Sequence, residues 1–141
     1  MFNVLEVLAS GLSTARMRVN VLASNIANAD TTKTDEGGPY RRKDVVQIAQ
    51  SQKASFSSTL DRMSLARPQI QAVIEDQSEP RQVFQPGHPD ANADGYVAYP
   101  NINVVTTMTD LMSASRLYQA NVTALETARQ MSSEALTIGR I

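Results

Sequence analysis

The sequence lacks cysteine and tryptophan altogether and has only one histidine. Without cysteine the chain can form no disulfide and can offer no thiolate to a metal ion, which suits the cytosol and an oxidising compartment equally well. A lone histidine also falls short of the clustered ligands that zinc sites require. We therefore expect no cofactor and no bound metal, and we expect this histidine, His88, to be an exposed loop residue.

Charged residues are scarce, and long apolar runs do not occur. Asp, Glu, Lys and Arg make up 19% of the 141 residues, and the formal net charge is -1. A chain without a basic field is a poor ligand for nucleic acid or anionic lipid. No apolar run approaches the roughly 18 residues of a transmembrane helix. The N-terminal residues also lack the basic region and continuous apolar stretch of a secretory signal, so we expect no cleaved leader.

The residue sets that enzymes depend on are missing too. No Ser/His/Asp or Cys/His set, no glycine-rich phosphate loop and no cluster of carboxylates can be assembled from this sequence. We therefore expect neither catalysis nor a small-molecule substrate. The hydrophobic fraction of 42% nonetheless indicates a folded chain of one domain.

A heptad repeat of apolar side chains runs through the first 29 residues. Its members alternate at spacings of three and four, which is the coiled-coil pattern and predicts a long helix with one narrow buried seam. Gly11 lies off this seam and weakens the helix by about 1 kcal/mol relative to alanine. The seam residues are Leu5, Leu8, Leu12, Ala15, Val19, Leu22 and Ile26.

A second heptad repeat predicts a helix from residue 102 to the C-terminus. Pro100 and the following Asn101 and Asn103 mark its start, because the residue before a proline avoids helical angles and asparagine is a good N-cap. We expect the two helices, about 35 to 40 Å and about 55 Å long, to pair as a coiled coil. The second seam comprises Val104, Met108, Leu111, Ser115, Tyr118, Val122 and Leu125, and Ala128, Met131, Ala135 and Ile138 extend its apolar face.

The region between the helices has a different composition. Residues 30–101 hold all six prolines and four of the six glycines. Short apolar runs between these turn signals predict strands at 40–49, 70–75, 81–85 and 95–99. Residues 51–67 fit no strand pattern and are interpreted as a mobile loop or a short helix. We therefore predict an α+β fold, with residues 1–29 and 102–141 as a coiled-coil domain and residues 30–101 as a small central β-rich domain.

The helix faces outside the two seams are almost uncharged. Residues 1–30 carry four charges and residues 102–141 carry six, and each set sums to zero. Small uncharged polar side chains can be covered by a neighbour without the several kcal/mol that a buried ion costs. These faces are either the surface of a monomeric bundle or are covered by other subunits. The second interpretation is favoured, because two helices and a small β insert cannot bury Val4, Val7, Val21, Met112 and Leu117.

Two short motifs resemble ligand sites but lack essential parts. DANADG places Asp90, Asn92, Asp94 and Gly95 as in a calcium loop, but the twelfth position is Asn101 rather than Glu, so an Asx turn ending in glycine is favoured over a calcium-binding module. The cluster Arg41–Lys43 is interpreted as a salt-bridged strand edge rather than a phosphate contact, because Asp35, Glu36 and Asp44 lie close by.

Three blocks of sequence, in this order, resemble the rod and hook proteins of the bacterial flagellum. They are LASNIANADTT with GGPYRRKDVV, then PGHPDANADGYVAYPNINVV, then MSASRLYQANVTALETAR. The NIAN element is shared by these proteins generally, whereas the other blocks are similar to a proximal rod protein; residues 51–67 match none of the family patterns. The residues that carry the resemblance are Asn25, Ile26, Ala27, Asn28, Pro39, Tyr40, Arg41, Arg42, Gly95, Tyr96, Val97, Pro100, Asn101, Ser113, Ala114, Ser115, Arg116, Tyr118, Ala120 and Asn121.

The resemblance implies a structural subunit that leaves the cytoplasm uncleaved through the flagellar type III export apparatus and polymerises in the periplasm. Its partners would be copies of itself, other rod proteins and the adaptor at the membrane ring. In that family NIAN ends the first helix, so we predict that Asn25 and Asn28 bond backbone groups freed there while Ile26 keeps the seam closed. A soluble coiled-coil adaptor with a β insert, or another rod or hook protein, remains the alternative.

Overall fold

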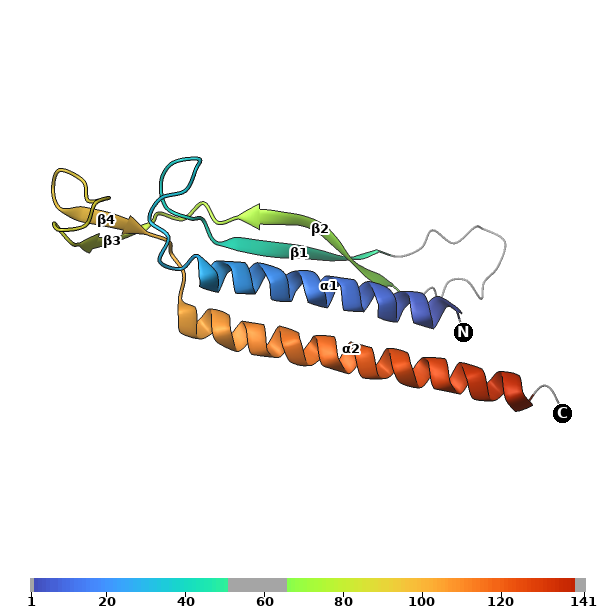
Figure 1. The fold of residues 1–141 in the computed structure, drawn as a ribbon. Helices are drawn as coiled ribbons and strands as arrows, with labels where there is room; N and C mark the ends of the chain where they lie inside the picture. The colour runs from blue at the N-terminus through green and yellow to red at the C-terminus, as the bar shows by residue number, and fades with distance from the viewer. Residues whose placement is uncertain (1, 51–65, 139–141) are drawn as a thin grey trace.

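A computed structural model describes residues 2–50 and 66–138 of the chain. The elements are α1 (Phe2–Ala27), β1 (Lys43–Gln50), β2 (Arg67–Glu75), β3 (Arg81–Phe84), β4 (Tyr96–Tyr99) and α2 (Val104–Ile138). The two helices run antiparallel, side by side, and all the strands lie between them in the sequence (Figure 1). The predicted α+β class is confirmed, and each predicted strand is observed with its ends shifted by no more than a few residues.

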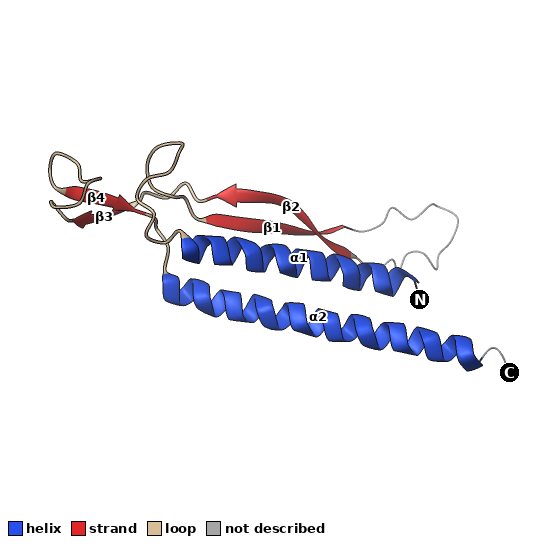
Figure 2. Ribbon diagram, in the orientation of Figure 1, coloured by secondary structure: helices blue, strands red, loops and turns tan. Residues whose placement is uncertain are grey.

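The helix α1 lies in the middle of a layered arrangement. It packs along α2 on one side and against both β1 and β2 on the other (Figure 2). Strands β1 and β2 pair antiparallel, with an irregularity in register between Val46 and Gln47. Arg67 of β2 forms an ion pair with Glu6 of α1, which fastens the ribbon near the N-terminal end of the helix. We refer to this pair of strands as the β1–β2 ribbon.

Strands β3 and β4 form a separate two-stranded sheet beyond the end of α1. They pair antiparallel from Arg81 opposite Tyr99 to Phe84 opposite Tyr96, and they contact no other helix or strand in the described part of the chain. Within residues 30–50 and 66–101 the strands thus form two ribbons rather than one sheet, and the first packs on α1. Of the segment 51–67, residues 51–65 lie outside the described residues, whereas Arg67 begins β2.

Few side chains are fully buried, and most of those are small. Ala15 and Leu22 of α1 and Ala114 of α2 are among the buried residues. A Cβ built on Gly11 would lie 3.5 Å from Nδ2 of Asn121, so this glycine lies at the helix contact although it is off the predicted seam. Small residues at such positions let two helix backbones approach closely. The start of α2 is as predicted, because Asn103 Oδ1 accepts the N–H of Thr106 at 3.1 Å as an N-cap.

Candidate assembly surfaces

The predicted seam of α1 faces inward along its whole length. Ala15 and Leu22 are buried, Leu5, Leu8, Leu12, Val19 and Ile26 are half-buried, and none of the seven is exposed. Leu12 lines the same groove as Tyr118 of α2, which places this side of α1 at the helix contact. Where α1 meets the β1–β2 ribbon, Val21 and Leu22 line a cavity with Val45, and Asp110 of α2 lies at the same cavity.

The inward stripe of α2 differs from the predicted seam. Leu111, Tyr118 and Leu125 lie in it as expected, and Ser115 and Val122 are half-buried beside it. The prediction is wrong for Val104 and Met108, whose side chains are 39% and 52% exposed. The stripe consists of Thr107, Leu111, Ala114, Tyr118, Asn121, Leu125, Ala128 and Ser132, all buried or half-buried.

The prediction failed because part of the inward stripe of α2 is polar. The stripe keeps the heptad period, but Thr107 and Asn121 are polar, so a pattern of apolar residues alone does not include them. The Thr107 hydroxyl donates to the Asn103 carbonyl at 2.8 Å, which lets this polar side chain be buried. The side chain of Ile138 lies outside the described residues.

The end of α1 is joined to the β1–β2 ribbon by one buried side chain. Asn25 is 1% exposed, and its Nδ2 donates to the carbonyl oxygen of Lys43 at 2.8 Å. Its Oδ1 accepts the N–H of Lys43 at 2.9 Å and the hydroxyl of Tyr40 at 3.1 Å. The amide therefore pairs with the first residue of β1 as a neighbouring strand would. The bond of Asn25 to helix-end groups was wrongly predicted.

Asn28 behaves as predicted. Its Nδ2 donates to the Ser24 carbonyl at 2.9 Å, and its own N–H bonds the same oxygen at 3.0 Å, so a carbonyl freed at the helix end is satisfied twice. Ile26, between the two asparagines, is half-buried in the predicted seam. The chain then turns back at Gly37 and Gly38, whose φ angles of +88° and +79° favour glycine.

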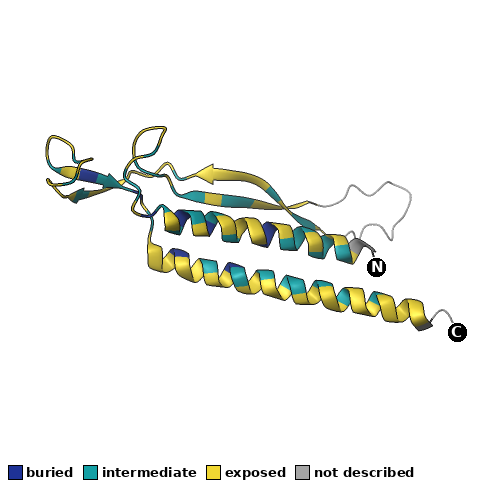
Figure 3. Cartoon of the chain, viewed as in Figure 1, coloured by how far each residue is buried: buried dark blue, intermediate teal, exposed yellow. Residues whose placement is uncertain are grey.

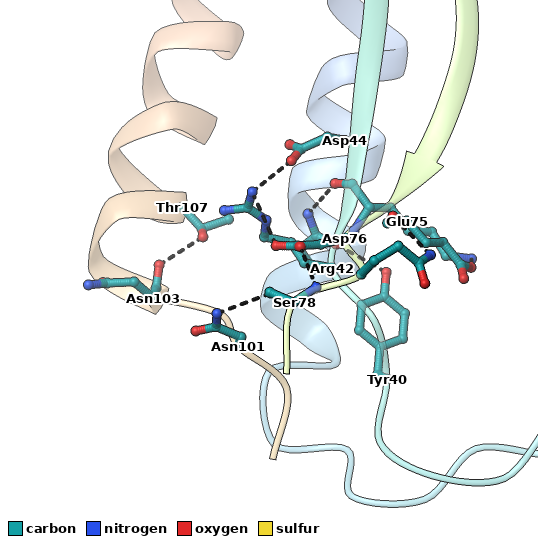
Figure 4. A network of polar contacts seen from close by, with 12 residues as sticks. Tyr40, Arg42, Asp44, Glu75, Asp76, Ser78, Asn101, Asn103 and Thr107 are labelled. Carbon is teal, nitrogen blue, oxygen red and sulfur yellow. Dashed lines mark hydrogen bonds and ion pairs between the residues drawn. The ribbon is translucent and has the colours of Figure 1, made fainter. Parts of the chain in front are cut away.

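A network of charged and polar side chains lies at the end of the β1–β2 ribbon where Asn25 pairs with Lys43 (Figure 4). Arg42 Nη2 lies 2.8 Å from the Asp44 carboxylate and 3.5 Å from that of Asp76. Asp76 Oδ1 accepts the N–H of Ser78 at 2.9 Å, and the Ser78 hydroxyl accepts a bond from Asn101 at 3.2 Å. This chain of contacts ties the ribbon to the segment that enters α2.

The electrostatics of this network follow from its hydrogen bonds. Bonds from Ser78 hold the pKa of Asp76 below its usual value of 3.8, and the Arg42 guanidinium acts in the same direction. The predicted salt-bridged strand edge is confirmed for Asp44. The other carboxylates come from β2 and its end: Asp76 for Arg42 and Glu75, at 3.5 Å, for Lys43. Asp35 and Glu36 form no ion pair within the described residues.

The DANADG loop forms the predicted Asx turn. Asn92 Oδ1 accepts the N–H groups of Asp94 at 3.0 Å and of Tyr96 at 2.8 Å, and Gly95 has a φ of +81°. No group of three or more His, Asp or Glu side chains that could hold a metal occurs within residues 2–50 and 66–138. Asp90 instead accepts the hydroxyl of Thr32 at 2.7 Å, which fastens the loop to the α1–β1 connection.

His88 lies in a loop as predicted, but it is half-buried rather than exposed. Its side chain is half-buried, its ring centroid lies 6.4 Å from that of Tyr99, and its Nδ1 accepts the N–H of Asp90 at 3.1 Å. The local turn and the aromatic contact with β4 hold it in place. This is a structural role for the one histidine of the chain.

Most of α2 is exposed (Figure 3), and large apolar residues are among the exposed ones. Val105, Met112, Leu117, Met131 and Leu136 are all more than half exposed. A soluble monomer rarely shows so many large apolar side chains on one element, and surfaces of this kind mark contacts with other proteins. Of the five side chains that the sequence left without cover, Val4, Met112 and Leu117 are exposed, whereas Val7 and Val21 are half-buried. In the described residues no helix is long and apolar enough to cross a membrane.

The residues of the sequence motifs are distributed over these surfaces. Val97, Pro100 and Ala114 are buried; Pro39, Tyr40, Arg42, Gly95, Ser115, Tyr118 and Asn121 are half-buried; Ala27, Arg41, Tyr96, Asn101, Ser113, Arg116 and Ala120 are exposed. Six of them line one pocket at the junction of the ribbon, namely Pro39, Tyr40, Arg41, Arg42, Pro100 and Asn101, and the others lie elsewhere. They lie along the helix contact, at the junction of the ribbon, and on outer faces, which is the distribution of a structural protein.

Comparison with known proteins agrees with this distribution. The family model for flagella basal body rod proteins matches residues 5–33, and that for the C-terminal part of flagellar basal body rod FlgEFG proteins matches residues 93–138. The flagellar basal-body rod protein FlgC of Salmonella typhimurium is 38% identical over 140 residues, which covers 99% of this chain and 98% of the relative. The chain belongs to the FlgC family of flagellar basal-body rod proteins.

Other members of the family are equally complete matches. FlgC of Bacillus subtilis is 41% identical over 149 residues, and FlgC of Borreliella burgdorferi is 33% identical over 147 residues, with at least 97% of each relative covered. The chain is therefore a structural subunit of the basal-body rod and not an enzyme. The two family models fall on α1 with its end and on β4 with α2, so the helix pair is the part that the wider rod family shares.

Proposed function

We propose that this FlgC-family subunit polymerises in the periplasm as part of the proximal rod and transmits torque from the membrane ring to the distal rod and hook. Its partners in this proposal are copies of itself, the other rod proteins, the adaptor at the rod base, and the type III export apparatus, through which it leaves the cytoplasm without a cleaved signal. Membership of the FlgC family supports a place in the rod, and the exposed faces of α2 support assembly with other subunits.

The observation that carries the proposal is the apolar and nearly uncharged outer surface of α2. Covering one Leu, Met or Val side chain that is now more than half exposed contributes on the order of 1 kcal/mol. The six such residues on α2 therefore offer several kcal/mol to an assembly and nothing to the isolated chain; they are Val105, Met108, Met112, Leu117, Met131 and Leu136. Few charges oppose this burial, since α2 has only five within its described length.

In this proposal α1 and α2 form an inner coiled-coil domain from residues 1–29 and 102–141. The antiparallel contact of α1 and α2 supports this pairing. The residues beside the two inward stripes are only half-buried, so other subunits can pack against them. Residues 30–101 form the outer part, and among its described strands β3 and β4 alone contact neither helix. Contacts between different surfaces of neighbouring subunits do not close on themselves, so they extend into a helical tube.

A complementation experiment tests the proposal. A deletion strain is supplied with the natural chain, with Leu117→Glu, or with Gln119→Glu as a control on a different side of α2. We expect the natural chain and the control to restore swimming and rods that are visible in isolated basal bodies, and we expect Leu117→Glu to restore neither. A closed oligomer of the purified chain in solution, together with normal rods in the deletion strain, would favour the soluble adaptor instead.

A further inference from the structure

The C-terminal end of α2 extends past the beginning of α1 (Figure 1). Gly11 of α1 lies opposite Asn121 of α2, and α1 begins at Phe2, nine residues before Gly11. Because the helices are antiparallel, the part of α2 that has α1 beside it ends at about residue 130. We refer to residues 131–138 as the α2 tail.

The inward stripe of α2 continues into this tail but loses its cover there. Ala128 and Ser132 are half-buried members of the stripe, whereas Ala135, the next position at the same spacing, is exposed. Met131 lies four residues before Ala135, so the two share a face of the helix, and Met131 is 63% exposed. A helix that keeps its apolar stripe beyond the end of its partner has a surface ready for a second partner.

An open groove lies between α1 and α2, with Tyr118 of α2 on one side and a stripe of α1 on the other. The members of this stripe are spaced four, three and four residues apart and are all exposed; they are Ala9, Ser13, Arg16 and Asn20. Leu12 and Met17 also line the groove and give it apolar surface. Because Ala9 and Ser13 are small, a helix that lies in the groove can approach the backbone of α1 closely.

The β1–β2 ribbon leaves this groove open. Arg18 and Leu22 of α1 line the cavity at the ribbon, and they follow Arg16 and Asn20 of the groove by two residues each. Residues two apart on a helix point to different sides. The ribbon and the groove are therefore on different sides of α1, and a helix can enter the groove without displacing the ribbon.

We infer that the α2 tail of one subunit lies in this groove on a second copy of the chain, with Met131 and Ala135 against α1. The inference rests on the proposed function, since it names one of the contacts that join subunits in the rod. A subunit cannot make this contact with itself, because Tyr118 of the groove and Ala135 lie on one continuous helix, about 25 Å apart. The two surfaces differ, so the contact is heterologous and passes from copy to copy.

Charges within the two surfaces support a copy of the chain as the occupant. Among the described residues that line the groove, Arg16 alone is charged, and it forms no ion pair with any other described residue. Glu134 lies three residues after Met131, on the same side of the tail, where it accepts a bond from Gln130 at 3.0 Å but has no ion-pair partner in the described ranges. Arg129, two residues before Met131, points to another side. The tail thus brings a carboxylate and an apolar face to a groove that has a guanidinium and an apolar lining.

Cysteine cross-linking tests the inference directly, because the natural chain has no cysteine. Ser13→Cys places a thiol in the groove, Ala135→Cys places one on the tail, and both positions are exposed. The variants are made singly and together, and basal bodies from complemented, motile cells are treated with a short bis-maleimide. We expect the double variant to give dimers and higher multiples of the chain, at least about tenfold more than either single variant. Within one subunit the two thiols are about 24 Å apart along the helices, which is beyond the reach of the reagent.

Ser13→Cys combined with Ser133→Cys is the matched control. Ser133 is exposed on the same tail, but it lies two residues from Ala135 and so on a different side. This pair is expected to give no more cross-linked chain than the single variants. Equal ladders from both pairs, motile cells of the Ser13→Cys and Ala135→Cys variant without a ladder, or a tail cysteine that cross-links only to another flagellar protein overturn the inference and leave the proposed function intact. A natural chain that enters no basal body overturns the proposed function itself.

A charge-reversal arm decides the question even where a cysteine variant does not assemble. Arg16 and Glu134 are both exposed, so Arg16→Glu and Glu134→Arg are not expected to unfold the chain. Each single change is expected to lose most of the swimming of the complemented strain, and the two together to restore it, because the pair is then reversed rather than broken. Full swimming of both single variants contradicts the inferred contact, as does a double variant no better than the singles.

Discussion

Replacing Asn25 by alanine is expected to loosen the end of α1 from the β1–β2 ribbon. The side chain is 1% exposed and serves both the N–H and the carbonyl of Lys43 as well as the Tyr40 hydroxyl. Leaving a buried polar group without its partner costs about 1 to 3 kcal/mol. Because Lys43 and Tyr40 are only half-buried, water replaces part of what is lost. We expect a total loss of about 2 to 4 kcal/mol in the free energy of unfolding.

Urea unfolding followed by far-UV circular dichroism measures this loss. The titration is run with a fixed concentration of trimethylamine N-oxide, which favours buried states and keeps the helix pair formed in the monomer. With an m-value on the order of 2 kcal/mol per molar urea, the midpoint should fall by about 1 to 2 M. Hydrogen exchange adds a local readout, since the amide of Lys43 should lose protection before the middle of α1 does.

Asn20→Ala is the matched control for this experiment. Asn20 is exposed on the same helix and makes no such junction, so alanine there should be neutral or slightly stabilising through helix propensity. Equal midpoints for Asn25→Ala and Asn20→Ala would refute the reasoning, because the paired amide would then contribute nothing to the junction.

Three further predictions concern acid, the hairpin and the isolated chain. Because the folded-state pKa of Asp76 is lowered, its contribution to stability should be complete above pH about 4 and be lost as pH falls through the folded value. The urea midpoint of the natural chain should therefore fall with pH in this range, and Asp76→Asn should make that fall smaller. Gly95→Ala should destabilise the hairpin by about 1 to 2 kcal/mol and speed amide exchange in β3 and β4, because its φ is +81° and its Cβ would meet Phe84, whereas Gly87→Ala should not. The dilute monomer without osmolyte should show far less helix than the assembled chain, and sharp, protected amide signals for residues 1–28 would contradict this.

The sequence was sufficient to predict the helices and the strands, because both follow from local patterns. Heptad spacing gave α1 and its inward seam, and turn signals bounded the strands. The register of α2 was harder, because Thr107, Ala114 and Asn121 contribute little apolar surface and only the structure places them at the contact. A search for heptads of small residues as well as large ones would have found this stripe.

The long-range contacts could not be predicted from local sequence patterns. The amide of Asn25 pairs with the backbone of Lys43, which is 18 residues away, and nothing at either position shows it. The β1–β2 ribbon was predicted as strands, but Val45 and Val46 are both apolar, so the pattern does not tell which face packs on α1. Only one face of a ribbon that is apolar on both faces can pack on α1, so the other face is free to contact a neighbour.

The most direct test is a density map of the assembled rod that contains this chain, obtained by electron cryo-microscopy of isolated basal bodies. The account predicts that Val105, Leu117 and Met131 of α2 are covered by neighbouring subunits around a helical tube. If these side chains face open solvent in the assembled rod, the helices are not held by their outer faces and the account is contradicted.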